Sequence, residues 1–119
     1  MKKKILIVED DPMILKMMQV ILEDYDLSMA TDGRDAVNKT LEIKPDIVLM
    51  DLSLPVLDGY GAVKEIKNSS LISHIPVIAL TASKIPFSQL KEKGFENYQE
   101  KPFVPDALID KIEKTLADK

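Results

Sequence analysis

Three short apolar runs and one weaker predicted strand in this sequence are each followed by residues whose side chains can take part in chemistry. The runs are ILIV at 5–8, IVLM at 47–50 and VIAL at 77–80, and the weaker strand is predicted over 95–99. The residues that follow them are Glu9 and Asp10, Asp51, Thr81 and Lys101. An unbroken apolar run predicts a strand buried on both faces, as in the middle of a parallel sheet. Because the carboxyl ends of parallel strands meet at one edge of the sheet, we expect these side chains to lie together.

The three carboxylates of this set predict a divalent-cation site. Carboxylates that lie close together repel one another, so the site needs a cation to offset their charge. Hard oxygen ligands with open positions for water suit Mg²⁺ rather than Zn²⁺. Asp51, kept ionised by the cation and by Lys101, is then a candidate nucleophile that would form an acyl phosphate. Thr81 would offer a hydroxyl donor, and Lys101 a positive charge, to the other phosphoryl oxygens.

Each of these residues also has a purely structural interpretation. Asp51 alone could cap a strand or a turn. Glu9 and Asp10 could be solvated acids that help to cap the first helix. Thr81 could simply end its strand, and Lys101 could be an ordinary surface lysine. The functional interpretation therefore depends on all five residues meeting at one edge of the sheet.

Two other residue types are assigned no chemistry. His74 is the one histidine, lies in a polar linker and has no Cys or second His with which to form a metal site, so we predict a surface residue. The five methionines after Met1 are predicted to be core or half-buried filler rather than a partner groove. They are Met13, Met17, Met18, Met29 and Met50.

Length and composition indicate one mildly acidic domain over 1–119, with no output domain. The chain has 119 residues, 45% hydrophobic and 5% aromatic, and a net charge of −4. The absence of Cys excludes disulfides and thiolate metal sites. Scattered lysines and a negative net charge argue against direct nucleic-acid binding. No apolar stretch approaches a signal peptide or a membrane span, so we expect a cytoplasmic protein.

Five strands alternating with five helices predict an α/β fold, a parallel sheet with helices on both sides. The strands are expected at 5–8, 27–30, 47–50, 77–80 and 95–99. The helices are expected at 12–24, between the Asp32-Gly33 turn and Pro45, at 58–68, at 88–93 and at 105–116. The strand at 27–30 ends in nothing chemical, which predicts a peripheral position. Lys84-Ile85-Pro86-Phe87 interrupts any long helix before 88–93.

These residues lie in motifs that resemble the receiver domain of two-component response regulators, in particular stand-alone receivers like the chemotaxis regulator. The motifs are ILIVEDDP at 5–12, KPDIVLMDLSLPVLDG at 44–59, IPVIALTA at 75–82 and YQEKPF at 98–103. The resemblance covers essentially the whole chain. It implies a flavodoxin-like, doubly wound sheet of strand order 2-1-3-4-5.

The resemblance also implies a role for each site residue. Asp51 matches the phosphoacceptor, and Thr81 and Lys101 match the family's hydroxyl and its lysine, which is followed by a cis peptide bond to Pro102. Tyr98 matches an aromatic that turns inward when Thr81 moves toward the phosphate. The implied metal ligands are Glu9, Asp10, Asp51 and the backbone carbonyl of Ser53. Ser53 and Ser83 match positions that tune phosphate lifetime.

The implied function is that of a phosphorelay receiver. It would accept a phosphoryl group from a phosphohistidine on a histidine kinase or a histidine phosphotransfer protein, and then switch a surface that binds a downstream protein target. It would not be an enzyme beyond catalysing its own phosphorylation and dephosphorylation, and would be a monomer or a weak phosphorylation-dependent dimer. No membrane partner is implied. The stretch 82–94 is shorter than is usual in the family, which bears on the fourth helix and its partner face.

Two alternatives stay open at this point. The first is a receiver that works without phosphorylation, through a fixed surface. The second is a Mg²⁺-dependent phosphatase that forms an aspartyl phosphate. Such enzymes have a second acid two residues after the nucleophile, and this chain has Ser53 there.

Overall fold

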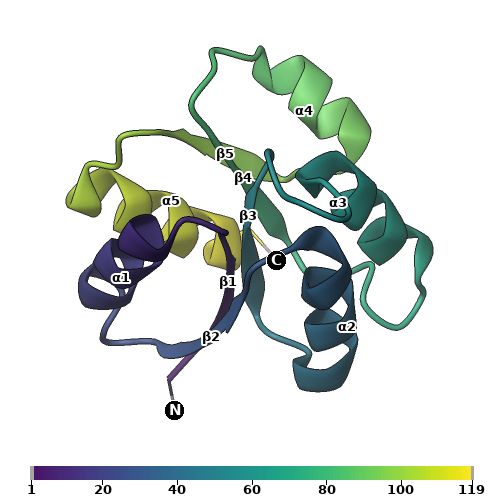
Figure 1. Cartoon of the computed structure of the whole chain (residues 1–119), viewed down its shortest axis with the longest axis horizontal. Coiled ribbons are helices and arrows are strands. Elements are labelled where there is room, and N and C mark those ends of the chain that lie inside the picture. Colours follow the sequence, from purple (N-terminus) through teal and green to yellow (C-terminus); the bar gives the residue numbers. More distant parts are fainter. Residues whose placement is uncertain (1, 119) are drawn as a thin grey trace.

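A computed structural model describes residues 2–118. Its centre is a parallel sheet in the order β2-β1-β3-β4-β5 (Figure 1). The strands are β1 (Lys4–Val8), β2 (Asp26–Ala30), β3 (Ile47–Asp51), β4 (Val77–Thr81) and β5 (Asn97–Glu100). The predicted α/β class and flavodoxin-like strand order are confirmed, and β2 lies at one edge as expected. The last strand begins two residues later than predicted, because Phe95 is buried in the core before the strand starts.

Five helices cover the two faces of the sheet, α1 and α5 on one and α2, α3 and α4 on the other (Figure 1). They are α1 (Pro12–Ile21), α2 (Gly33–Ile43), α3 (Gly59–Asn68), α4 (Phe87–Lys93) and α5 (Pro105–Ala117). The prediction that the first helix runs to Asp24 is wrong. Leu22 ends α1, and the Tyr25 N–H donates to the Leu22 carbonyl at 3.0 Å in the turn that leads into β2. No helix in residues 2–118 is long and apolar enough to cross a membrane.

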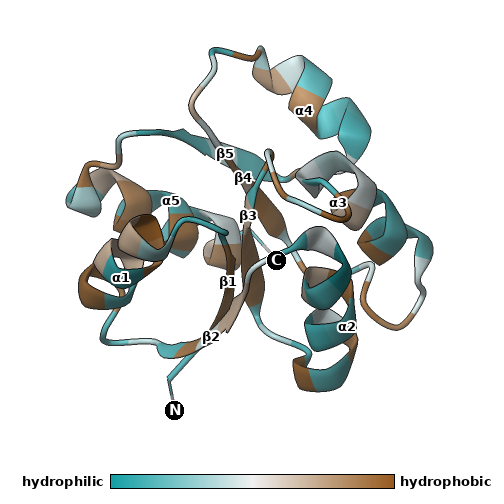
Figure 2. Cartoon of the chain, viewed as in Figure 1, coloured by the Kyte–Doolittle hydropathy of each residue, from teal (hydrophilic) through white to brown (hydrophobic). Residues whose placement is uncertain are grey.

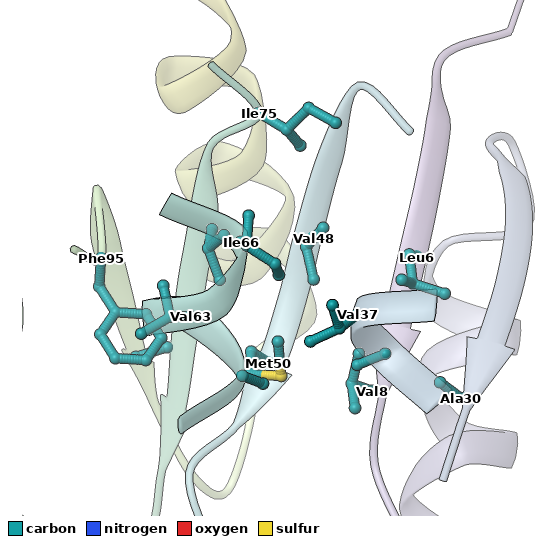
Figure 3. Close-up of a cluster of buried hydrophobic side chains, with 14 of the residues drawn as sticks. Leu6, Val8, Ala30, Val37, Val48, Met50, Val63, Ile66, Ile75 and Phe95 are labelled. Atoms are coloured by element: carbon teal, nitrogen blue, oxygen red, sulfur yellow. The ribbon is translucent and has the colours of Figure 1, made fainter. Parts of the chain in front are cut away.

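Alternate residues of the three inner strands fill two separate cores. Both faces of β3 and β4 are buried, which is why these strands read as unbroken apolar runs. Figure 2 shows the strands as the most hydrophobic part of the chain. In Figure 3, Val8, Val48 and Met50 meet Val37 of α2 and Val63 of α3. Ile7, Leu49 and Leu80 point the other way and pack against α1 and α5. The sheet is therefore held on both sides, and its carboxyl edge is a rigid base for side chains.

Aspartates begin three of the helices. Asp11, Asp32 and Asp58 each accept a hydrogen bond from a backbone N–H in the first turn of α1, α2 and α3. A side-chain acceptor at this position satisfies N–H groups that the helix itself cannot. Asp11 thus caps α1 at the residue just before Pro12. α4 begins after Pro86 without a side-chain cap.

The predictions for His74 and for the methionines have different outcomes. His74 is exposed, as predicted. Met18 and Met50 are fully buried and Met29 is half-buried, also as predicted. The prediction is wrong for Met13 and Met17, whose side chains are 80% and 40% exposed. The apolar residues of α1 run around more than one face of the helix, and only one face packs on the sheet.

Candidate functional site

A cleft of about 740 Å³ opens at the carboxyl ends of the inner strands. The turns after β1, β3 and β4 and the connection from β5 to α5 bring polar side chains to it. The sequence-predicted residues that line the cleft are Glu9, Asp10, Asp51, Ser53, Thr81 and Lys101. Of the predicted set, Tyr98 alone does not line it. This arrangement agrees with the expectation that the ends of parallel strands bring these side chains together at one edge of the sheet.

Three carboxylates meet in the cleft. Glu9, Asp10 and Asp51 each offer an oxygen, and these oxygens lie within 4.8 Å of one another. Glu9 and Asp51 are buried, whereas Asp10 is exposed at the mouth. Hard oxygen donors at this separation, with open solvent on one side, fit a small divalent cation such as Mg²⁺. The acidic group of this chain therefore has the chemistry of a metal site.

Lys101 spans two of these acids. Its Nζ lies 2.7 Å from Glu9 Oε1 and 3.4 Å from Asp51 Oδ1. Burial alone would lower the pKa of the Lys101 ammonium, but its hydrogen bond to Glu9 and the charges of Glu9 and Asp51 outweigh burial, and the pKa is raised. Lys101 is therefore charged at neutral pH and sits beside the Asp51 carboxylate. The peptide bond from Lys101 to Pro102 is cis, as the family resemblance implied.

Glu9 is the most deeply buried of the acids, with 1% of its surface exposed. An ion pair usually lowers the pKa of its carboxyl group, yet the pKa of Glu9 is raised. Burial of the carboxyl is the largest cause, and the hydrogen bonds from Lys101 and from the Asp11 N–H only partly offset it. Both carboxylate oxygens of Glu9 accept a hydrogen bond, Oε1 from Lys101 Nζ and Oε2 from the Asp11 N–H at 3.2 Å.

The backbone around Asp51 holds its carboxylate in place. The Ser53 N–H donates to Asp51 Oδ1 at 3.2 Å, which closes a small loop at the end of β3. The Gly59 N–H donates to the Leu52 carbonyl at 3.0 Å and ties α3 to this loop. A methyl group at Gly59 would collide with the backbone oxygen of Asp51, so only glycine allows this close approach. The Asp58-Gly59 pair therefore caps α3 and also packs against the strand end that carries the acid.

The Thr81 hydroxyl is engaged with its own loop. It donates to the Ser83 carbonyl and accepts from the Ser83 N–H, both at 3.0 Å. Thr81 is buried at the wall of the cleft, and Ser83 is exposed. To reach a group on Asp51, this hydroxyl would have to exchange its bond to the Ser83 carbonyl for a new one. A hydroxyl can rotate to do so at low cost.

Tyr98 lies outside the cleft, on the other side of the loop that Thr81 begins. Its half-buried ring stacks on Phe87, with centroids 5.6 Å apart and an interplanar angle of 28°. Lys111 Nζ lies 4.5 Å from the Tyr98 centroid. The ring is thus held between the start of α4 and the face of α5. Residues 81–87 join the wall of the cleft to this ring stack.

Sequence reasoning missed the apolar border of the cleft. An apolar recess of about 320 Å³ adjoins the site on its α1 side. It is lined by Ile14, Met17, Ala82, Lys101, Pro102 and Phe103. Met13, Met17 and Val20 continue this surface along the exposed side of α1 and are called the α1 patch below. Their spacing of four and three residues is helical, and that was the available signal, but it resembles the spacing of the buried face.

The chain matches the family model of the response regulator receiver domain over residues 5–113. It therefore belongs to the family of response regulator receiver domains, proteins of two-component signalling. It is 35% identical to the alkaline phosphatase synthesis transcriptional regulatory protein PhoP of Bacillus subtilis, over 98% of this chain and 49% of PhoP. It is 33% identical to the polar-differentiation response regulator DivK of Brucella anthropi, over 99% of both proteins. The chain thus spans about half the length of PhoP and nearly all of DivK.

Solved structures show the same fold. The receiver domain of the sensor histidine kinase PA1611 of Pseudomonas aeruginosa superposes with a TM-score of 0.90, at 31% identity and over 98% of this chain and 99% of that one. That structure has a magnesium ion coordinated in its active-site cleft. The chemotaxis protein CheY4 of Vibrio cholerae superposes with a TM-score of 0.89, at 28% identity and over 97% of this chain and 99% of that one.

Proposed function

We propose that this receiver accepts a phosphoryl group from a phosphohistidine onto Asp51, with Mg²⁺, and then changes a surface that binds a protein target. The observation that carries the proposal is the joint geometry of three carboxylates within 4.8 Å and a lysine 3.4 Å from Asp51 Oδ1, in an open cleft. Such a site concentrates negative charge and therefore favours a divalent cation, which together with Lys101 would offset the repulsion between these acids and an anionic phosphoryl group.

Asp51 is the proposed acceptor because it is central to the site and is held by the Ser53 N–H. One of its carboxylate oxygens would bond to phosphorus as the phosphorus–nitrogen bond of the donor breaks. The imidazole nitrogen keeps that electron pair and takes up a proton. The Lys101 ammonium offsets negative charge that develops on the phosphoryl oxygens. Thr81 would donate its hydroxyl hydrogen to one of these oxygens once its bond to Ser83 opens.

The metal would be held by Glu9, Asp10, Asp51 and the backbone carbonyl of Ser53. When bound, Mg²⁺ would provide a binding point for phosphoryl oxygens and offset charge that repels them. Asp10 is the most open of the acids and lies at the mouth. The acidic group and the magnesium in the PA1611 receiver support this assignment.

The α1 patch supports a protein, rather than a small molecule, as the phosphodonor. Met13, Met17 and Val20 are 80%, 40% and 66% exposed beside the cleft. Contiguous apolar residues on the surface of a monomer mark interaction sites. A partner protein that brings a histidine to Asp51 would meet the rim of the cleft, and the apolar recess that Met17 lines adjoins this rim. A histidine kinase or a histidine phosphotransfer protein has the required chemistry.

The output surface would be formed by α4, β5 and α5. Movement of Thr81 toward the phosphoryl group would pull on residues 82–86 and so on Phe87, whose ring stacks on Tyr98. Tyr98 would then turn inward and change the face that a downstream protein reads. We propose a cytoplasmic setting, no catalysis beyond the receiver's own phosphorylation and dephosphorylation, and no direct contact with nucleic acid or membrane.

Incubation with phosphoramidate and Mg²⁺, followed by intact-mass measurement, tests this function. We expect an acid-labile gain of one phosphoryl group that is lost in Asp51→Asn and retained in Asp110→Asn, an exposed aspartate of α5. A gain that persists in Asp51→Asn would contradict the proposal. No gain at all would favour a receiver that works without phosphorylation. Sustained turnover of external phosphomonoesters would instead indicate a phosphatase.

A further inference from the structure

The five methionines within residues 2–118 fall into three classes of exposure. Met13 and Met17 are 80% and 40% exposed, whereas Met18 and Met50 are fully buried. Met29 is half-buried, and its sulfur accepts a hydrogen bond from Gln19 Nε2 at 3.7 Å. Reagents that attack sulfur therefore meet Met13 and Met17 first, because susceptibility to oxidation follows exposure.

The two exposed methionines lie on the side of α1 that borders the cleft. Met17 lines the apolar recess that Lys101 and Phe103 also line, next to the cleft. Met13 stands one turn earlier on α1, and its backbone N–H donates to the Asp11 cap at 2.9 Å. A partner that delivers a phosphoryl group to Asp51 across the α1 patch would cover both sulfurs. Methionine suits such a surface because it is apolar and adapts its shape to a partner.

We propose that Met13 and Met17 form a peroxide-sensitive modification site that controls access of the protein phosphodonor. Conversion of these thioethers to sulfoxides blocks docking on the α1 patch and leaves the chemistry at Asp51 intact. This inference rests on the proposed function, and in particular on a donor that covers α1.

The chemistry needs only a peroxide as co-reactant. The methionine sulfur attacks one peroxide oxygen, a sulfur–oxygen bond forms and the oxygen–oxygen bond breaks. The sulfur is oxidised by two electrons, and the peroxide is reduced to water, or to an alcohol if it is an organic peroxide. The product is polar and chiral where the thioether was apolar and flexible, and sulfoxide reductases reverse the change.

A sulfoxide on the α1 patch should weaken docking strongly. Covering a polar oxygen with apolar partner atoms removes its water and leaves it without a hydrogen bond. We expect each buried sulfoxide to lower the rate of transfer from a protein donor by about tenfold or more. Transfer from phosphoramidate needs no contact with the α1 patch, so its rate should change by less than about twofold.

The first measurement is site-resolved oxidation. The protein is treated with hydrogen peroxide, the peroxide is removed, and peptides are analysed by mass spectrometry. Met13 should oxidise fastest, Met17 next and Met29 later, while Met18 and Met50 stay reduced in the folded protein. Oxidation of Met18 or Met50 at the rate of Met13 would overturn the assignment.

The second measurement compares two phosphodonors before and after oxidation. One is phosphoramidate, and the other is an autophosphorylated histidine kinase that transfers to the untreated protein. We expect loss of transfer from the kinase alone and recovery after sulfoxide reductase. In the double variant Met13→Leu and Met17→Leu, the rate of transfer after peroxide should equal that variant's own rate before peroxide. Equal transfer from the kinase before and after oxidation would overturn the inference. A failure of the untreated protein with phosphoramidate would instead contradict the proposed function.

Discussion

The two helices on either side of the cleft, α1 and α4, differ in how firmly they are anchored to the rest of the protein. On one side, α1 has ten residues, begins with Pro12, and is capped by Asp11 with bonds to two backbone N–H groups. Met18 is fully buried, and Ile14, Leu15 and Ile21 pack beside it. On the other side, α4 has seven residues, has no side-chain cap, and buries Leu90 alone. Figure 2 shows α4 as mostly hydrophilic, with few hydrophobic bands.

This difference suits the proposed function, in which one side of the cleft meets a donor and the other side changes. A helix with a cap and several buried side chains opens rarely, whereas a short helix with one anchor opens at low free energy. Under the proposed function, α1 would present a constant surface to a donor. The segment from Thr81 to α4 has fewer buried anchors and would be the part that follows a change at Asp51.

Removing the single anchor of α4 should have the largest effect. Leu90→Ala and Met18→Ala each delete a fully buried side chain, and each should cost about 2–5 kcal/mol. We expect Leu90→Ala to accelerate amide hydrogen exchange chiefly in residues 87–93. Met18→Ala should instead lower protection from exchange across the sheet. Urea unfolding measures the loss of stability in both variants. Equal acceleration over the whole chain in Leu90→Ala would erase the proposed contrast between the flanks.

Loss of the α1 cap should have the next largest effect. Asp11→Ala removes the acceptor for the Met13 and Ile14 N–H groups and should lower the free energy of unfolding by about 1 kcal/mol. Asp106→Ala is a matched control, because Asp106 lies in the first turn of α5, whose N-terminus has no side-chain cap. Urea unfolding measures both variants. A loss in Asp106→Ala as large as in Asp11→Ala would mean that general helix charge, and not capping, stabilises α1.

The stacking of Phe87 on Tyr98 should contribute less to the free energy of unfolding. Phe87→Ala should remove about 0.5–1.5 kcal/mol of ring-pair energy, in addition to the loss from the apolar area that becomes exposed, and should free the Tyr98 ring. Beryllium fluoride with Mg²⁺ should then shift the Tyr98 ring signals in NMR spectra at lower concentration than in the unchanged protein. Phe87→Leu, which keeps an apolar contact, should lie between the two. An unchanged midpoint in Phe87→Ala would separate this ring pair from the switch.

The smallest effect should come from Lys111. Its Nζ lies 4.5 Å from the Tyr98 centroid and 3.4 Å from Asn97 Oδ1, so Lys111→Met should cost about 0.5–1 kcal/mol. Lys114→Met is the control, because Lys114 pairs with Asp110 only at the exposed surface. Thermal unfolding of both variants at low and high salt measures the difference. Indistinguishable melting curves would show that the contact of Lys111 with the Tyr98 ring does not stabilise the protein.

Much of the fold and the site was predictable from local patterns. The runs around Ile7, Leu49 and Ile78 are apolar at every position because both faces of their strands are covered, and this leaves no helical period. The acids and Lys101 were predictable as a group because every parallel strand ends at the same edge. Tyr98 as a switch residue came from the family resemblance alone, and its role stays a prediction.

The predictions were wrong where one sequence pattern is compatible with several ways of packing the segment. Helical spacing places Met18 with Leu22 on the inner face of α1, but the helix is apolar around most of its circumference, and nothing local shows that Met17 is left exposed. The choice depends on how the helix lies against α5 and the sheet. In the same way, Phe95 was predicted to begin a strand, but its ring is buried and packs against Tyr60 of α3.

The sequence by itself therefore determined the layers and the set of polar residues at the carboxyl edge, because these follow from periodicity and from the ends of apolar runs. The strand order came from the family resemblance. Only the tertiary structure decided which partner each polar group takes. Lys101 lies closer to Glu9 than to Asp51, the Thr81 hydroxyl is bound to Ser83, and the Met13 sulfur is left in solvent. Lys101 and the two acids come from distant segments, the Thr81 bond depends on how the loop after β4 folds, and the exposure of Met13 depends on how α1 lies on the sheet. No local pattern records these arrangements.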